Sequence, residues 1–111
     1  MCQMVRAALL AVLAFAVLAA PADARVRCTI HNTAFPTLSE LTGSNVGCTS
    51  VRSVAVAIQE GWAKTQSFPR TVRAVDRTWR CTYHERQGET NPYYKAICVS
   101  GRRTVGAVLG S

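Results

Sequence analysis

Cysteine and histidine have the most versatile side-chain chemistry in this sequence, and twice they stand three residues apart. Cys28 precedes His31, and Cys81 precedes His84. Two thiolates and two imidazoles can hold a tetrahedral zinc ion. Both segments, however, have the alternating pattern of an extended strand, in which residues three apart point to opposite faces. We therefore expect no metal site here, and we interpret the cysteines as structural.

Four cysteines follow residue 24, and an even number in a short exported chain predicts two disulfides with three connectivities. They are Cys28, Cys48, Cys81 and Cys98. A hairpin whose turn is centred between residues 89 and 90 places Cys81 directly opposite Cys98. Opposed residues at a non-hydrogen-bonded position have Cα atoms about 4.5 Å apart, within reach of a disulfide. The sequence therefore favours Cys81–Cys98, which leaves Cys28–Cys48.

Acid–base catalysis would have to come from His31, His84, Asp76, Glu85 and a few serines. None of these forms a recognised arrangement of nucleophile and base, and the sequence has no G-x-S-x-G, phosphate-binding loop or paired-carboxylate motif. His84 and Glu85 are neighbours on an expected strand, so they point to opposite faces. We predict a protein without catalytic activity and without a cofactor, whose histidines are partly exposed strand residues.

Arginine is the other residue type that could bind a ligand, because 13 Lys and Arg stand against 6 Asp and Glu, for a net charge of +7. The candidate polyanion-binding residues are Arg70, Arg73, Arg77, Arg80, Arg102 and Arg103. The first four form one stripe if residues 70–80 are helical, and they scatter over both faces if the segment is extended. The alternative is an ordinary solvated basic surface, with Tyr93 and Tyr94 packed in the sheet.

The amino end has the pattern of a cleavable signal peptide. Arg6 precedes an unbroken apolar run from Ala7 to Ala20, and the triplet Ala22-Asp23-Ala24 offers an A-x-A cleavage site. As a helix the run would rise only about 21 Å, short of the roughly 30 Å core of a bilayer. We predict a signal peptide over 1–24 and one domain over 25–111, secreted or held in the periplasm or cell envelope, without a transmembrane segment in the mature chain.

One helix is expected, over residues 49–64, with Thr49 or Ser50 as its N-cap. Its apolar residues fall at helical spacing along one face. They are Val51, Val54, Ala55, Ile58 and Trp62. The Ser67-Phe68-Pro69 segment is expected to end the helix.

Strands are expected around this helix. Residues 32–47 carry Pro36, Gly43 and Gly47 among serines and threonines, which predicts a loop with one helical turn near 37–41. Gly101-Arg102 is typical of a two-residue type II′ turn. The expected strands are 25–30, 78–86, 93–100 and 103–109, with 71–75 as a short strand or a linker. One face is expected to carry Trp79, Cys81, Tyr83, Tyr94, Ala96, Cys98 and Val105. The fold class predicted is α+β, with one main helix packed on a small antiparallel three- to four-stranded meander and two disulfides.

Three segments resemble a group of small exported bacterial proteins, common in actinobacteria, that have no assigned function. The shared pattern is a cysteine that opens an apolar helix, an aromatic-x-Cys strand and a Cys-x-x-Gly-Arg-Arg hairpin. Here these are Cys48-Thr49-Ser50-Val51, Trp79-Arg80-Cys81 and Cys98-Val99-Ser100-Gly101-Arg102-Arg103. The resemblance covers roughly residues 46–105. It implies secretion and the α+β plan, and it implies no activity.

The cysteine order is also similar to that of secreted subtilisin inhibitors, which have two disulfides and a helix that begins at the second cysteine. This chain is shorter between its last two cysteines and has no counterpart of the inhibitory loop, so no reactive-site residue is carried over. The sequence therefore predicts a small secreted basic protein that binds the cell envelope, a polyanion or another extracellular protein, with no specific nucleic acid. A protease-inhibitor-like module that presents the 87–92 loop is the alternative.

Overall fold

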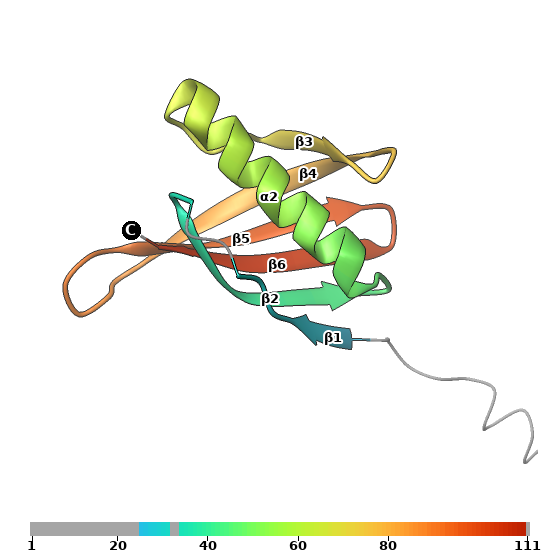
Figure 1. Cartoon of the computed structure of the whole chain (residues 1–111), viewed down its shortest axis with the longest axis horizontal. Coiled ribbons are helices and arrows are strands. Elements are labelled where there is room, and N and C mark those ends of the chain that lie inside the picture. Colours follow the sequence, from blue (N-terminus) through green and yellow to red (C-terminus); the bar gives the residue numbers. More distant parts are fainter. Residues whose placement is uncertain (1–24, 32–33, 111) are drawn as a thin grey trace, which may run out of the picture.

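The computed structural model describes residues 25–31 and 34–110, and these form a six-stranded antiparallel sheet crossed on one face by a single helix (Figure 1). The strand order is β1-β2-β6-β5-β4-β3. The elements are β1 (Arg25–Cys28), β2 (Thr37–Ser44), α2 (Cys48–Thr65), β3 (Thr71–Ala74), β4 (Arg77–Arg86), β5 (Tyr93–Ser100) and β6 (Arg103–Gly110). The predicted signal peptide, residues 1–24, lies outside the described residues.

The sheet corrects the prediction of a three- to four-stranded meander. Strands β3 to β6 do form a meander, but β2 pairs with the free edge of β6, and β1 then pairs with β2. The prediction of a loop with a helical turn over 32–47 was wrong for residues 37–44. A bulge between Ser39 and Thr42 separates the buried Leu38 and Leu41 by three residues, which is the spacing of a helical turn.

The predicted helix is confirmed, and it begins one residue earlier than expected. Its N-cap is Gly47, not Thr49 or Ser50, and no side chain caps it. The backbone N–H of Val51 donates to the carbonyl of Gly47 over 3.1 Å, so the first turn closes from the residue before Cys48. The disulfide of Cys48 to Cys28 ties this first turn to the end of β1.

Both predicted disulfides are present, one between β1 and α2 and one between β4 and β5. The Cα atoms of Cys28 and Cys48 are 5.5 Å apart, and those of Cys81 and Cys98 are 4.0 Å apart. The predicted hairpin registers are confirmed, since Cys81 faces Cys98 and Ser100 faces Arg103. The φ of Gly101 is 61°, as the first position of a type II′ turn requires.

The core lies between the helix and the sheet. On the helix, Val51, Val54, Ala55 and Ile58 are buried as predicted, whereas Trp62 is half-buried. The predicted sheet face joins this core through its buried residues Trp79, Cys81, Ala96, Cys98 and Val105, with Tyr83 and Tyr94 packed against them. Within the part of the chain that the structure describes, no helix is long and apolar enough to cross a bilayer.

Candidate functional site

The face of the sheet that points away from α2 carries many of the exposed basic side chains, and we call it the open face. Strand alternation assigns residues to it, because alternate side chains of each strand point away from the helix. On β4 the buried Trp79 and Cys81 point to the helix, so Arg80 between them points to the open face, where it is exposed. The basic residues placed there in this way are Arg25, Arg27, Arg73, Arg80, Arg86 and Lys95, all exposed.

Three of the six predicted arginines lie together at the β3 margin of this face. Thr71 of β3 faces Arg80 of β4. One residue further along β4, the backbone N–H of Cys81 donates a hydrogen bond to the carbonyl of Arg70 over 2.8 Å. Arg70 and Arg80 therefore line the same shallow hollow where β3 begins. Arg73 lies further along β3, and its guanidinium donates to the Thr78 hydroxyl over 3.3 Å.

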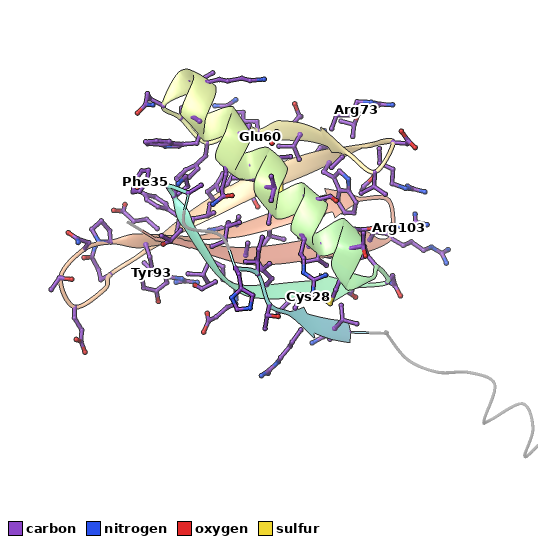
Figure 2. All side chains as sticks on the ribbon, in the orientation of Figure 1. Cys28, Phe35, Glu60, Arg73, Tyr93 and Arg103 are labelled. Atoms are coloured by element: carbon purple, nitrogen blue, oxygen red, sulfur yellow. A yellow bond between two sulfur atoms is a disulfide. The ribbon has the colours of Figure 1, made fainter. Side chains whose placement is uncertain are left out.

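The other three predicted arginines lie at one end of the sheet. Arg77 begins β4, while Arg102 and Arg103 form the β5–β6 turn and the start of β6. Arg80 of β4 pairs with Val99 near the end of β5. Arg77, three residues earlier on the antiparallel β4, therefore lies near the turn that follows β5. Figure 2 shows Arg73 and Arg103 at this end of the molecule and Tyr93 toward the other. Residues 70–80 form a hairpin, so the helical-stripe hypothesis for the arginines is wrong.

The sequence reasoning missed four basic residues of the open face: Arg25, Arg27, Arg86 and Lys95. A signal was available in β4, where every second residue from Thr78 to Arg86 is polar while Trp79 and Cys81 are apolar. The same alternation in β1 places Arg25 and Arg27 on one side and Val26 and Cys28 on the other. Reading charge together with period 2 would have found these residues.

The positive charges are not neutralised by ion pairs. All 12 basic and 5 acidic residues that follow residue 24 are among the described residues, and none of these side chains forms a salt bridge with another. Arg52, beside the start of α2, instead donates to the Thr29 carbonyl over 2.8 Å. The basic side chains of the open face are therefore solvated cations that form no ion pair with a described carboxylate.

A second hollow lies on the open face at the bulge of β2. Arg27 of β1 and Lys95 of β5 contribute to its lining, together with Thr42 of β2 and Gly106 of β6. Glu40, at the bulge of β2, also lines this hollow, so one carboxylate lies among these cations. Two cations in the lining of one hollow can hold an anionic group, whereas the Glu40 carboxylate repels it.

The histidines and tyrosines do not gather into a reactive site. His84 faces Lys95 across the β4–β5 pair and is exposed, and His31 is exposed after β1. All four cysteines of the described residues are disulfide-bonded, so they offer no thiolate for a metal. No group of three or more metal-ligating side chains occurs within 25–31 and 34–110. Tyr94 packs against the core as the sheet-packing alternative expects.

Comparison of the chain with known proteins found no match among family models, curated proteins or solved structures.

Proposed function

We propose that this protein binds an anionic polymer on the open face of its sheet. One observation carries this proposal: six exposed basic side chains lie on one uncovered face, and no described carboxylate pairs with any of them. A polymer that brings closely spaced anionic groups to such a face releases its counter-ions, which favours binding without any specific shape. An anionic polymer of the cell envelope is the partner that best fits this chemistry.

The open face suits a linear partner. Arg80 and Arg86 lie six residues apart on β4, about 20 Å along one strand. Lys95 lies beside this row on β5, and Arg73 lies beside it on β3. Arg25 and Arg27 form a second row on β1, at the opposite edge of the same face. At the usual strand spacing β1 lies about 19 Å from β4. A chain laid along β4 therefore meets several cations in succession.

The setting that we propose is outside the cytoplasm. The predicted signal peptide and the resemblance to small exported proteins support it, and the two disulfides are compatible with it. Amino-terminal sequencing of the extracellular product is expected to begin at Arg25. Recovery of the product only inside the cell, with residues 1–24 retained, would contradict this setting.

The test of polymer binding compares two sets of three neutralising substitutions. The open-face variant replaces Arg80, Arg86 and Lys95 with glutamine. The matched control replaces Arg77, Arg102 and Arg103 with glutamine, which changes the net charge equally at a different place. Affinity for inorganic polyphosphate and for heparin is measured as a function of salt. We expect the open-face variant to lower the slope of log affinity against log salt by about 2, and the control to leave it nearly unchanged.

Three results contradict the proposal. Equal losses in both variants would mean that net charge alone attracts the polymer. Binding that persists well above about 0.3 M salt would mean that ion release does not drive it. Salt-tolerant capture of one protease through the 87–92 loop would favour the inhibitor alternative instead.

A further inference from the structure

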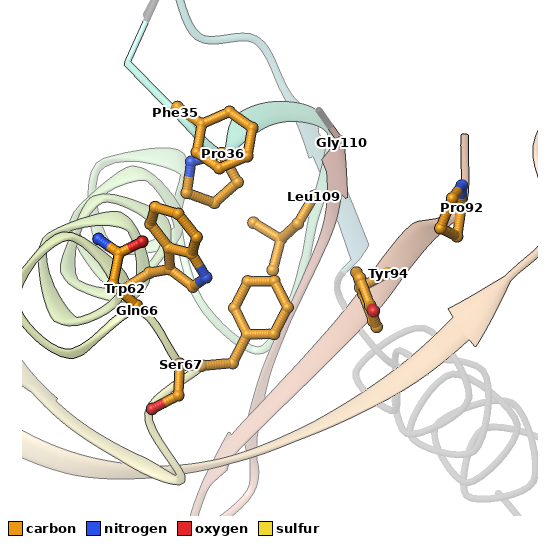
Figure 3. A pocket seen from close by; sticks show the side chains of 10 residues that line it. Phe35, Pro36, Trp62, Gln66, Ser67, Pro92, Tyr94, Leu109 and Gly110 are labelled. Atoms are coloured by element: carbon orange, nitrogen blue, oxygen red, sulfur yellow. The ribbon is translucent and has the colours of Figure 1, made fainter. Parts of the chain in front are cut away.

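A hollow lined by aromatic rings lies at the end of the molecule where α2 ends and β2 begins (Figure 3). Its volume is about 430 Å³. The aromatic residues that line it come from three parts of the chain: Phe35 before β2, Trp62 and Phe68 at and just after the end of α2, and Tyr94 of β5, accompanied by Pro36 and Pro92. None of its lining residues is charged. We call it the aromatic hollow, and it is separate from the basic open face.

One wall of the aromatic hollow is held by a buried polar side chain. Gln59 is the one buried polar residue among the described residues, at 4% exposure. Its Nε2 donates to the Pro36 carbonyl over 2.7 Å and lies 3.3 Å from the Ala34 carbonyl. These bonds fix the segment that carries Phe35, whose ring meets that of Trp62 edge-on at 4.8 Å between centroids. The position of Phe35 in this wall is therefore fixed by two residues of α2, Gln59 and Trp62.

The opposite wall is held by a second hydrogen bond. The Tyr83 hydroxyl donates to the Pro69 carbonyl over 2.6 Å. Phe68, next to Pro69, stacks on the Tyr83 ring at 4.8 Å and meets Tyr94 edge-on at 5.0 Å. Both walls are thus in place before a ligand arrives, and a preformed site avoids the entropy cost of ordering side chains on binding.

Three side-chain hydrogen-bond donors in the lining have no partner among the described residues: the Trp62 indole N–H, the Tyr94 hydroxyl and the amide of the exposed Gln66. Figure 3 shows the indole nitrogen on the side of the Trp62 ring that faces Leu109 and Tyr94. The other tryptophan differs, because its indole N–H donates to the Ala74 carbonyl over 3.0 Å. An indole N–H can only donate, so a ligand that pairs with Trp62 must bring an acceptor.

We propose that the aromatic hollow binds a small, uncharged aromatic compound that carries a carbonyl or similar acceptor oxygen. The ring packs among the four aromatic side chains, which favour edge-to-face and offset contacts with another ring. The oxygen accepts from the Trp62 indole. A volume of about 430 Å³ is in the range of small-ligand pockets. A charged compound is disfavoured because no lining side chain would compensate its loss of hydration.

Two-dimensional ¹H–¹⁵N NMR of the purified chain tests this directly, since its two tryptophans give two indole signals. The probes are acetophenone, isopropylbenzene as a ring of similar size without an acceptor, and benzoate as a charged ring. We expect acetophenone to shift the Trp62 indole signal in a saturable way and to leave the Trp79 signal in place. Benzoate is expected to bind more weakly than acetophenone.

Two variants separate the hydrogen bond from the packing. Trp62→Phe leaves a smaller ring and removes the donor, so it is expected to weaken acetophenone about two- to ten-fold more than isopropylbenzene, which loses ring contact alone. Phe35→Ala removes a wall that is 50% exposed and outside the core, and it is expected to weaken both probes. Binding of the variants is followed by ligand-detected NMR, and an unmoved Trp79 indole signal shows that the fold is retained.

The proposal is overturned if acetophenone produces no saturable shift, or if both indole signals move together. It is also overturned if Trp62→Phe weakens the two neutral probes equally, because the indole N–H would then have no role. Binding of a neutral ring does not depend on ion release, so adding about 0.5 M salt is expected to leave it unchanged. This distinguishes the aromatic hollow from the open face, and either site can fail without the other.

Discussion

At the scale of single residues, two long polar side chains hold irregular segments in place, one against the helix and one against the sheet. Gln59 reaches from α2 to the carbonyl of Pro36, and Tyr83 reaches from β4 to the carbonyl of Pro69. Neither segment has a strand partner at these positions, so a side chain supplies the hydrogen bond that its backbone needs. The half-buried Tyr83 also responds to pH, because burial raises its pKa from 10.0 to about 12 by loss of hydration of the phenolate.

Tyr83 therefore gives a prediction about stability at high pH. The folded chain holds the phenol proton more tightly than the unfolded chain does. Its contribution is fully present below pH 10.0 and is lost as the pH rises toward about 12. Urea unfolding at about pH 9 and about pH 11 should show a smaller loss of unfolding free energy in Tyr83→Phe than in the unsubstituted chain. At neutral pH the variant is expected to be less stable by about 1 kcal/mol, for the lost hydrogen bond.

Tyr93→Phe is the control for this experiment, because its hydroxyl forms no hydrogen bond with the described residues. It is expected to follow the unsubstituted chain at both pH values. If Tyr83→Phe does the same, burial of this phenol does not govern the alkaline loss of stability.

At the scale of elements, the bulge in β2 decides how the open face is built. Ser39 faces Val108 and Thr42 faces Gly106, so β2 advances three residues while β6 advances two. Because of the extra residue, the side chain of Leu41 points to the helix side of the sheet, as that of Leu38 does. Glu40, with a φ of 49°, is left exposed. The bulge thus brings Glu40 into the hollow that also holds Arg27 and Lys95.

Glycine should be tolerated at Glu40 in the bulge and should be unfavourable at Ser39 beside it. A non-glycine residue at positive φ costs of order 1 kcal/mol, so Glu40→Gly is expected to leave the midpoint of thermal unfolding unchanged or to raise it. Ser39→Gly, in the extended part of β2, is expected to lower stability by about 0.5–1 kcal/mol. Both are measured by circular dichroism. A larger loss in Glu40→Gly than in Ser39→Gly would contradict this account of the bulge.

At the scale of the whole molecule, a short chain depends on covalent links to supplement its core. A domain of fewer than 100 residues buries only about 60–65% of its unfolded surface, which leaves little stability in reserve. The two disulfides span 20 and 17 residues, one from β1 to α2 and one across the β4–β5 pair. The first joins the sheet to the helix, and the second joins two neighbouring strands within the sheet.

Removal of either disulfide is expected to cost about 3 kcal/mol of unfolding free energy, the value for loops of this length. The variants are the paired alanine substitutions at Cys28 and Cys48, and at Cys81 and Cys98, with urea unfolding as the measurement. Non-reducing peptide mapping gives the control on connectivity. A linked peptide of Cys28 with Cys81, or losses below about 0.5 kcal/mol in both variants, would contradict this role.

The prediction of the fold succeeded where residues close in sequence interact. The helix, the β4–β5 and β5–β6 registers and the Cys81–Cys98 bond all follow from local spacing, and each is confirmed. It failed at β2, whose pairing with β6 joins residues 60 to 73 positions apart. The alternation of β2 is interrupted at Glu40, so period 2 is not visible in the sequence there.

The sequence by itself determined the charge, favoured the two disulfide pairs and predicted the β4–β5 and β5–β6 hairpins, because these depend on composition or on neighbours along the chain. Only the tertiary structure decided that six strands share one sheet and that Arg25 and Lys95 lie on the same face. It also brought Phe35, Trp62, Phe68 and Tyr94 around one hollow. The physical reason is that strand order and packing between distant segments arise from long-range contacts, which short-range periodicity does not encode.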